Sequence, residues 1–157
     1  MKNKFSVMFH HFHDDINHFA SQGSIDASTF EAMIYYLQEN YNLLSATEWL
    51  ERSRNGIISK NDICLSFDDS LKCQIDIALP ILEKHNLNAI FAIYTSVVEG
   101  EINFLEYIRY FRNVHFTNID AFYNEFFIII SKLGIDLGKI RVSIKKIGYL
   151  NKMEPKK

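Results

Sequence analysis

The stretch that most constrains the fold is residues 62–94, where an apolar run, a helical pattern and a second apolar run follow one another. Residues 62–67 are typical of a buried strand, and residues 71–85 place apolar side chains at helical spacing, with Pro80 expected to kink the helix. Residues 89–94 are again typical of a strand. Two strands joined by a helix predict a right-handed βαβ unit with parallel strands, and hence an α/β class.

Further elements are expected on both sides of this unit. They are a strand at 5–9, a helix capped by Ser24 or Asp26 and ending near Asn40, an extended piece at 42–44, a helix opened by Ser45 in a capping box with Glu48, helices at about 103–112 and 119–133, and a strand at 140–144. Cys64 and Cys73 lie inside predicted elements at a spacing typical of neither zinc nor redox motifs. We therefore expect two buried free thiols.

The net charge of −2, from 17 basic and 19 acidic residues, is unevenly distributed. Residues 1–138 carry ten basic and eighteen acidic residues, whereas residues 139–157 carry seven basic residues and one acidic residue. The acidic body argues against a nucleic-acid partner. No apolar run is long enough to span a bilayer, and no secretory signal is visible, so we expect no transmembrane segment and a cytoplasmic location.

Two polar clusters follow predicted strands: the histidine-rich residues 10–15 and the run Asp68-Asp69-Ser70. The carboxyl ends of parallel strands gather at one sheet edge, so both clusters are candidate sites. Adjacent aspartates in an extended chain point to opposite sides, so one carboxylate can bind a cation while the other takes a proton from a water. Two alternatives stay open: the aspartates cap the following helix, or His10, His11 and His13 form a metal site with Asp69.

Residues 63–95 resemble the polysaccharide deacetylases, the NodB-homology group of metal-dependent carbohydrate deacetylases. The family carries a Thr/Ser-Phe-Asp-Asp-Gly motif at a strand end. The matching segments are Ser66-Phe67-Asp68-Asp69 for this motif, residues 78–82 for the helix after it, residues 89–91 for the next strand, and residues 7–10 for an aromatic-His first strand. The best match covers residues 5–98.

The resemblance implies the N-terminal portion of a distorted (β/α) barrel, with parallel strands and flanking helices. It also implies a hydrolase that removes N-acetyl or O-acetyl groups from a cell-envelope or capsular glycan, with a divalent metal, commonly zinc, as cofactor. Asp68 matches the general base and Asp69 the metal-binding aspartate. His10 matches a first-strand histidine that lines the site, and we expect His11 and Ser70 to line it too.

The sequence departs from the family at two points. Ser70 stands where the motif has glycine, so the turn must suit a residue with a Cβ. The family's two metal-binding histidines, four residues apart on one helical face, are also missing: after Asp69 only His85 and His115 remain, and both are expected to be bystanders.

The chain is also short, because a closed barrel takes about 250 residues. We expect residues 1–138 to be a partial deacetylase domain and residues 139–157 a basic tail or a truncation junction. Two functions stay open: a truncated carbohydrate deacetylase, and a non-catalytic remnant that binds a glycan or another subunit. An incomplete barrel further predicts self-association through exposed strand edges.

Overall fold

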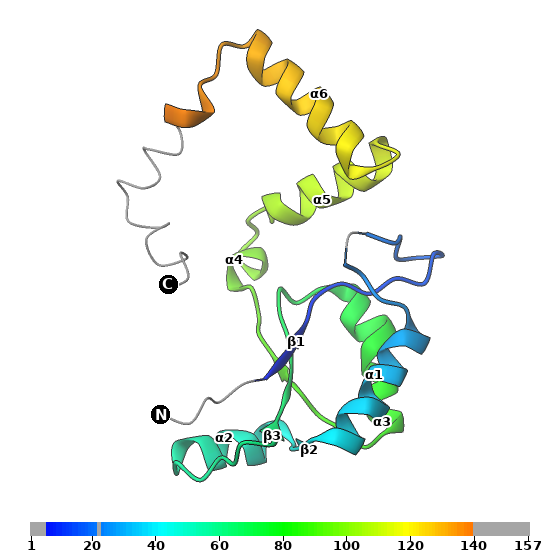
Figure 1. Cartoon of the computed structure of the whole chain (residues 1–157), viewed down its shortest axis with the longest axis vertical. Helices are drawn as coiled ribbons and strands as arrows, with labels where there is room; N and C mark the ends of the chain where they lie inside the picture. Colours follow the sequence, from blue (N-terminus) through cyan, green and yellow to red (C-terminus); the bar gives the residue numbers. More distant parts are fainter. Residues whose placement is uncertain (1–5, 22, 140–157) are drawn as a thin grey trace. The chain divides into compact units, whose positions relative to one another are not determined.

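A computed structural model describes residues 6–21 and 23–139, which belong to two compact units, Met1–Arg109 and Tyr110–Lys157. The elements in chain order are β1 (Val7–Phe9), α1 (Ala27–Asn40), β2 (Asn42–Leu43), α2 (Ala46–Arg54), β3 (Asp62–Ile63), β4 (Leu65–Phe67), the π-helical turn η1 (Gln74–Ala78), α3 (Leu79–Lys84), β5 (Ile90–Phe91), α4 (Thr95–Val98), α5 (Phe104–His115) and α6 (Ile119–Lys132) (Figure 1).

The first unit contains a parallel sheet in the order β1-β4-β5 and a parallel pair, β2-β3. Phe67 pairs with Phe9 on one side and with Phe91 on the other. The predicted βαβ unit is confirmed in its parallel pairing, because η1 and α3 connect the neighbouring strands β4 and β5. In the part of the chain that the structure describes, β1 and β5 are edge strands and the barrel is open.

The segment expected to form one strand at residues 62–67 instead forms two. β3 pairs with β2, while β4 begins after Cys64 and pairs with β1 and β5. The segment is buried nearly throughout, which explains its continuous apolar character, but it contributes to two sheets. Both cysteines are buried and free, as predicted, and burial raises the pKa of each thiol.

The helix after β4 contains the π-helical turn η1, in which the N–H of Leu79 donates to the carbonyl of Gln74. Pro80, in the first turn of α3, has no N–H to donate, so the sequence tolerates a break in the regular hydrogen-bond pattern just before it. The irregularity predicted at Pro80 is therefore a widened turn. Asp26, rather than Ser24, caps α1 by accepting a hydrogen bond from the Thr29 N–H at 2.7 Å.

The core of the first unit is built around four buried phenylalanines, Phe9, Phe12, Phe30 and Phe67, with the partly buried Phe91 packed against them. The Phe30 ring meets the rings of Phe9 and Phe12 edge-on, with centroids 5.0 and 5.1 Å apart, and Phe67 stacks on Phe91 at 4.7 Å. The buried residues packed with them come from α1, β3, β4 and the helix after β4: Ile34, Leu37, Ile63, Leu65, Cys73, Ile77, Ala78, Ile81 and Leu82. Each buried large apolar side chain contributes about 1.5–3 kcal/mol, which fixes the strand ends that carry the polar clusters.

The second unit has no buried residue between positions 110 and 139. Its aromatic rings contact one another in a chain, with Phe116 5.8 Å from Phe111 and 5.2 Å from Phe122. Asn118 caps α6 by accepting a hydrogen bond from the Ala121 N–H at 2.9 Å. The helices predicted near residues 103–112 and 119–133 are confirmed as α5 and α6.

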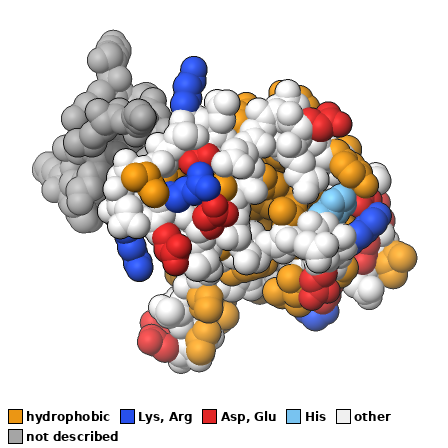
Figure 2. Space-filling model, turned by 90° about the horizontal axis from the view of Figure 1, so that it is seen from below, with side chains coloured by type: hydrophobic (Ala, Val, Ile, Leu, Met, Phe, Trp, Pro, Cys, Tyr) orange, Lys and Arg blue, Asp and Glu red, His pale blue; other side chains and the backbone are white. Residues whose placement is uncertain are grey.

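Apolar side chains also reach the surface, with acidic and basic side chains between them (Figure 2). None of the helices in residues 6–21 and 23–139 has the length and apolar character needed to cross a bilayer. The strand predicted at 140–144, and the basic tail apart from Lys139, lie outside the described residues. The domain boundary predicted at residue 138 stays a prediction.

Candidate functional site

The two predicted clusters meet at the carboxyl ends of β1 and β4. Because these strands pair in parallel, with Phe9 opposite Phe67, the residues that follow them emerge side by side. The Asp68 N–H donates to the Phe9 carbonyl at 3.2 Å, and His10 Nε2 lies 3.8 Å from Asp68 Oδ2. The structure therefore brings His10 and Asp68 together, although they are far apart in the sequence.

The turn after β4 is left-handed at both Asp69 (φ +70°) and Ser70 (φ +55°). The expectation that the two aspartates lie in an extended chain is wrong, because the chain reverses here instead of continuing as a strand. A left-handed residue with a Cβ costs about 1 kcal/mol, which gives a physical reason for glycine in the motif. Here the Ser70 hydroxyl donates to the Ala92 carbonyl at 3.1 Å and accepts from the Tyr94 N–H at 3.0 Å.

A buried glutamine holds the two strand ends together. Gln74 is 1% exposed, and its side-chain amide donates to the main-chain carbonyls of His10, at 2.9 Å, and Asp68. At the preceding residue, Cys73 Sγ accepts a hydrogen bond from the Phe12 N–H at 3.4 Å. The sequence analysis missed Gln74, although a polar side chain at helical spacing with Ile77 marks it as unusual on that face.

Asp69 belongs to a second cluster with residues of α5. Arg109 Nη1 lies 4.0 Å from Asp69 Oδ2 and 3.5 Å from His11 Nε2, and it pairs with the Glu106 carboxylate. His11 Nε2 lies 2.8 Å from the other oxygen of Glu106. Glu106 and Arg109 were not among the predicted site residues, and their spacing of three residues on one helix is their only local signal.

The two aspartates thus have different neighbours. Asp68 faces the imidazole of His10 and its side chain is 42% exposed, whereas Asp69 faces the guanidinium of Arg109 and is 28% exposed. Asp68, Asp69 and Glu106 bring three negative charges, of which Arg109 offsets one. With neutral histidines the site is acidic, so it attracts cations and repels anions.

Neither alternative for these residues is realised. The helix after β4 begins at Lys72, and among the described residues no main-chain N–H donates to the carboxylate of Asp68 or Asp69, so the interpretation of these aspartates as helix caps is wrong. His13 Nδ1 lies 2.9 Å from the Ser24 hydroxyl, so its partner differs from those of His10 and His11. Within residues 6–21 and 23–139, no group of three or more His, Cys, Asp or Glu side chains is placed to hold a metal ion.

The implied zinc site can be tested against this geometry. Catalytic zinc takes three protein ligands and keeps one position open. Asp69 offers a carboxylate, but Arg109 already places a cation beside it, and the described residues supply no complete ligand set. The residues present therefore do not fit a zinc site on their own, and zinc stays a prediction.

The comparisons with known proteins bear on the fold. No protein-family model and no curated protein sequence matches this chain. Among solved structures, a de-N-acetylase from Aggregatibacter actinomycetemcomitans is 24% identical with a TM-score of 0.50, and the match covers 62% of this chain and 40% of that one. The deacetylase PplD from Streptococcus pyogenes, solved with acetate, is 24% identical with a TM-score of 0.47, over 66% of this chain and 48% of that one.

This chain spans less than half the length of either of these proteins. The likeness concerns the N-terminal part of the chain, which holds the β1-β4-β5 sheet, its helices and the aspartate turn. At this identity it establishes the fold, as the motif resemblance predicts. Over its N-terminal part, the chain has the α/β fold of a de-N-acetylase, with the barrel open in the residues described.

Proposed function

We propose that this chain carries the general-base part of a carbohydrate deacylase, a hydrolase that removes N-acetyl or O-acetyl groups from a cell-envelope or capsular glycan. The observation that carries the proposal is the Asp68 carboxylate at the carboxyl end of β4. In the part of the chain that the structure describes, this carboxylate has no hydrogen-bond donor, and its charged neighbour is His10 at 3.8 Å. A half-exposed carboxylate of this kind is available to accept a proton.

Deacylation of an N-acetyl group breaks the bond between the acyl carbon and nitrogen, and water supplies the new oxygen. In the proposed reaction Asp68 accepts a proton from the attacking water and returns it to the departing nitrogen, which leaves acetate and a free amine. His10 lies beside Asp68 and can orient the carboxylate. Gln74 positions both residues through their main-chain carbonyls.

A divalent metal, when bound, would polarise the acyl carbonyl. Asp69 is the residue of this chain that we propose as its ligand, and the other ligands must come from outside the described residues. The fold supports this division, because the match covers 40% of the A. actinomycetemcomitans enzyme, and so most of that protein has no counterpart here.

The test is acetate release from N-acetylated chito-oligosaccharides by the 157-residue chain with added zinc or cobalt. Asp68→Asn is expected to lower the rate by about 100-fold or more, the usual contribution of a general base. Asp76→Asn is the matched control, because Asp76 lies on η1 and pairs with His18 and Lys72, and it should leave the rate unchanged. Metal-dependent release that survives Asp68→Asn would remove the role given to Asp68.

One observation favours a second function, a non-catalytic module that binds a glycan or another subunit. Arg109 lies beside Asp69, where a metal ligand should be free of competing cations. In this case zinc titrated into the chain gives no micromolar binding by calorimetry, and wild type and Arg109→Gln release no acetate. Micromolar binding that is lost in Asp69→Asn would count against this second function.

The open edges of β1 and β5 support a proposal of self-association, since unpaired strand edges can pair with another chain. Light scattering at increasing protein concentration tests it. A mass that rises with concentration is expected, and a monomer at the highest concentration would speak against it.

A further inference from the structure

A pocket of about 430 Å³ lies just beyond the end of β5. Its walls are Tyr94, Glu101, Ile102, Asn103, Phe104 and Leu105. All six residues belong to the same compact unit as Asp68 and Asp69. The segment contains the short helix α4 and the beginning of α5, and the proposed reaction assigns no role to its residues.

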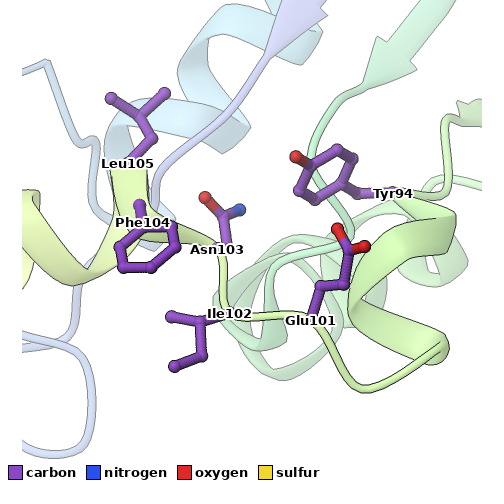
Figure 3. Close-up of a pocket in the computed structure, with 6 residues that line it drawn as sticks. All are labelled: Tyr94, Glu101, Ile102, Asn103, Phe104 and Leu105. Atoms are coloured by element: carbon purple, nitrogen blue, oxygen red, sulfur yellow. The ribbon is translucent and has the colours of Figure 1, made fainter.

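The lining combines apolar surface with neutral and acidic polar groups. In Figure 3 the Tyr94 hydroxyl, the Asn103 amide and the Glu101 carboxylate point toward a common space, while Ile102 and Phe104 extend to the other side. The Tyr94 side chain is 47% exposed, so its ring is open to a ligand. None of the six residues is basic, and one is acidic, which disfavours phosphates and other anions.

A neutral, hydroxyl-rich ring fits this chemistry best. A pyranose has an apolar face of C–H groups, which can lie on an aromatic ring, and an edge of hydroxyls that both donate and accept hydrogen bonds. The Asn103 amide offers a donor and an acceptor, the Glu101 carboxylate two acceptor oxygens, and the Tyr94 hydroxyl both functions. An apolar lining with a few convergent polar groups is also the usual composition of small-molecule sites.

Two hydrogen-bonded connections join the pocket to the aspartate turn. Ser70, next to Asp69, accepts a hydrogen bond from the Tyr94 N–H at 3.0 Å. On the other wall, the Asn103 side chain accepts from the Glu106 N–H at 3.2 Å, and Glu106 lies 2.8 Å from His11 in the site. Both walls are therefore held in place relative to the residues around Asp68 and Asp69.

We propose that this pocket is a carbohydrate subsite, which binds a sugar ring next to the one deacylated at Asp68. The choice of a glycan as the ligand rests on the proposed function. The inference assigns binding, however, to residues that take no part in the proton transfer. Tyr94 supplies the stacking surface, and Glu101 and Asn103 bind hydroxyl groups.

The test is binding of the N-acetylglucosamine tetramer to the full chain, followed by saturation-transfer NMR and titration. Tyr94→Ala is expected to raise the Kd about tenfold, since the sugar loses its aromatic contact, and tenfold corresponds to about 1.4 kcal/mol. Tyr94→Phe keeps the ring and should raise the Kd by about twofold to threefold. Tyr36→Ala is the control, because Tyr36 on α1 is similarly exposed, at 58%, and lies outside the pocket.

The outcomes separate this inference from the proposed function. Binding that weakens in Tyr94→Ala but not in Tyr36→Ala supports the subsite even where the wild type releases no acetate. Acetate release with a Kd and KM that Tyr94→Ala leaves unchanged would overturn the subsite while the proposed function stands. No binding by the folded wild type would also overturn it. A far-UV spectrum and melting curve for each variant show that it is folded, and Glu101→Gln, which changes charge but not shape, gives an independent loss of binding.

Discussion

Asp62 and Asp68 stand near opposite ends of one short segment, and the fold surrounds their carboxylates very differently. The Asp62 side chain is 1% exposed and accepts hydrogen bonds from the Ser59 N–H at 2.9 Å, the Asn42 amide at 2.7 Å and Arg52 at 3.2 Å. The Asp68 side chain is 42% exposed, and its charged neighbour within the described residues is His10 at 3.8 Å.

This difference separates a structural carboxylate from an available one. The Ser59 N–H, followed by the Asn42 amide, holds the pKa of Asp62 well below its ordinary range, because these bonds form best with the ionised group. Asp62 thereby ties β2, α2 and β3 together. The side-chain carboxylate of Asp68 accepts no hydrogen bond from the described residues, so it remains available for a water or a substrate.

The largest effect on stability should come from Asp62→Ala. Removing this buried carboxylate leaves the Asn42 amide and the Ser59 N–H without their acceptor, and Arg52 keeps Glu48 as a partner. We expect the free energy of unfolding in urea to fall by about 3 kcal/mol. Asp76→Ala is the control, with an expected loss below about 1 kcal/mol, because Asp76 is partly exposed on η1. Equal losses of unfolding free energy in the two variants would show that Asp62 has no special structural role.

Next in size is Gln74→Leu, which tests what positions the available carboxylate. The substitution replaces the polar amide with an apolar side chain of similar size, and it leaves the carbonyls of His10 and Asp68 without their donor. We expect a loss of about 1–2 kcal/mol in unfolding free energy. Where the wild type releases acetate, we also expect the rate of release to fall further in Gln74→Leu than in Leu82→Met, a control substitution in the core. An unchanged rate in a stable Gln74→Leu protein would show that Gln74 does not position the site.

The parallel sheet and the position of the two aspartates at a strand end were predictable from the sequence, because apolar runs, helical spacing and strand-end aspartates are local patterns. The division of the strand at Cys64 was not, since both halves are buried and only their different partners distinguish them. The pairing of His11 with Glu106, 95 residues later, is likewise set by the tertiary fold. The left-handed turn at Ser70 was suggested only by the glycine of the motif.

Acid should lower the stability of the fold through the buried carboxylate of Asp62. The folded-state pKa of Asp62 lies below its ordinary value of 3.8, so its contribution to stability is complete above about pH 4 and is lost as the pH falls further. Asp26, whose pKa is lowered to about 2 chiefly by the Thr29 N–H, acts in the same direction. We expect urea midpoints to fall below pH 4, and to fall less in Asp62→Asn. Identical pH profiles would show that Asp62 is not responsible.

The smallest effect on stability is expected from Ser70→Gly, in the turn that follows Asp68 and Asp69. Glycine relieves about 1 kcal/mol of left-handed strain but loses the two hydrogen bonds of the Ser70 hydroxyl to residues 92 and 94, so the net change should lie within about 1 kcal/mol. Ser66→Gly is a matched control, because it places glycine within β4, where φ is extended and only a loss is expected. Thermal melts compare the two, and a larger loss in Ser70→Gly would contradict the account.

The most direct test of the central claim is the unfolding free energy of Asp68→Asn in urea at pH 7. If the fold leaves the Asp68 carboxylate unused, the variant should unfold within about 0.5 kcal/mol of the wild type, as surface substitutions do. A loss near the 3 kcal/mol expected for Asp62→Ala would contradict the account, because Asp68 would then be a structural residue rather than one kept available for chemistry.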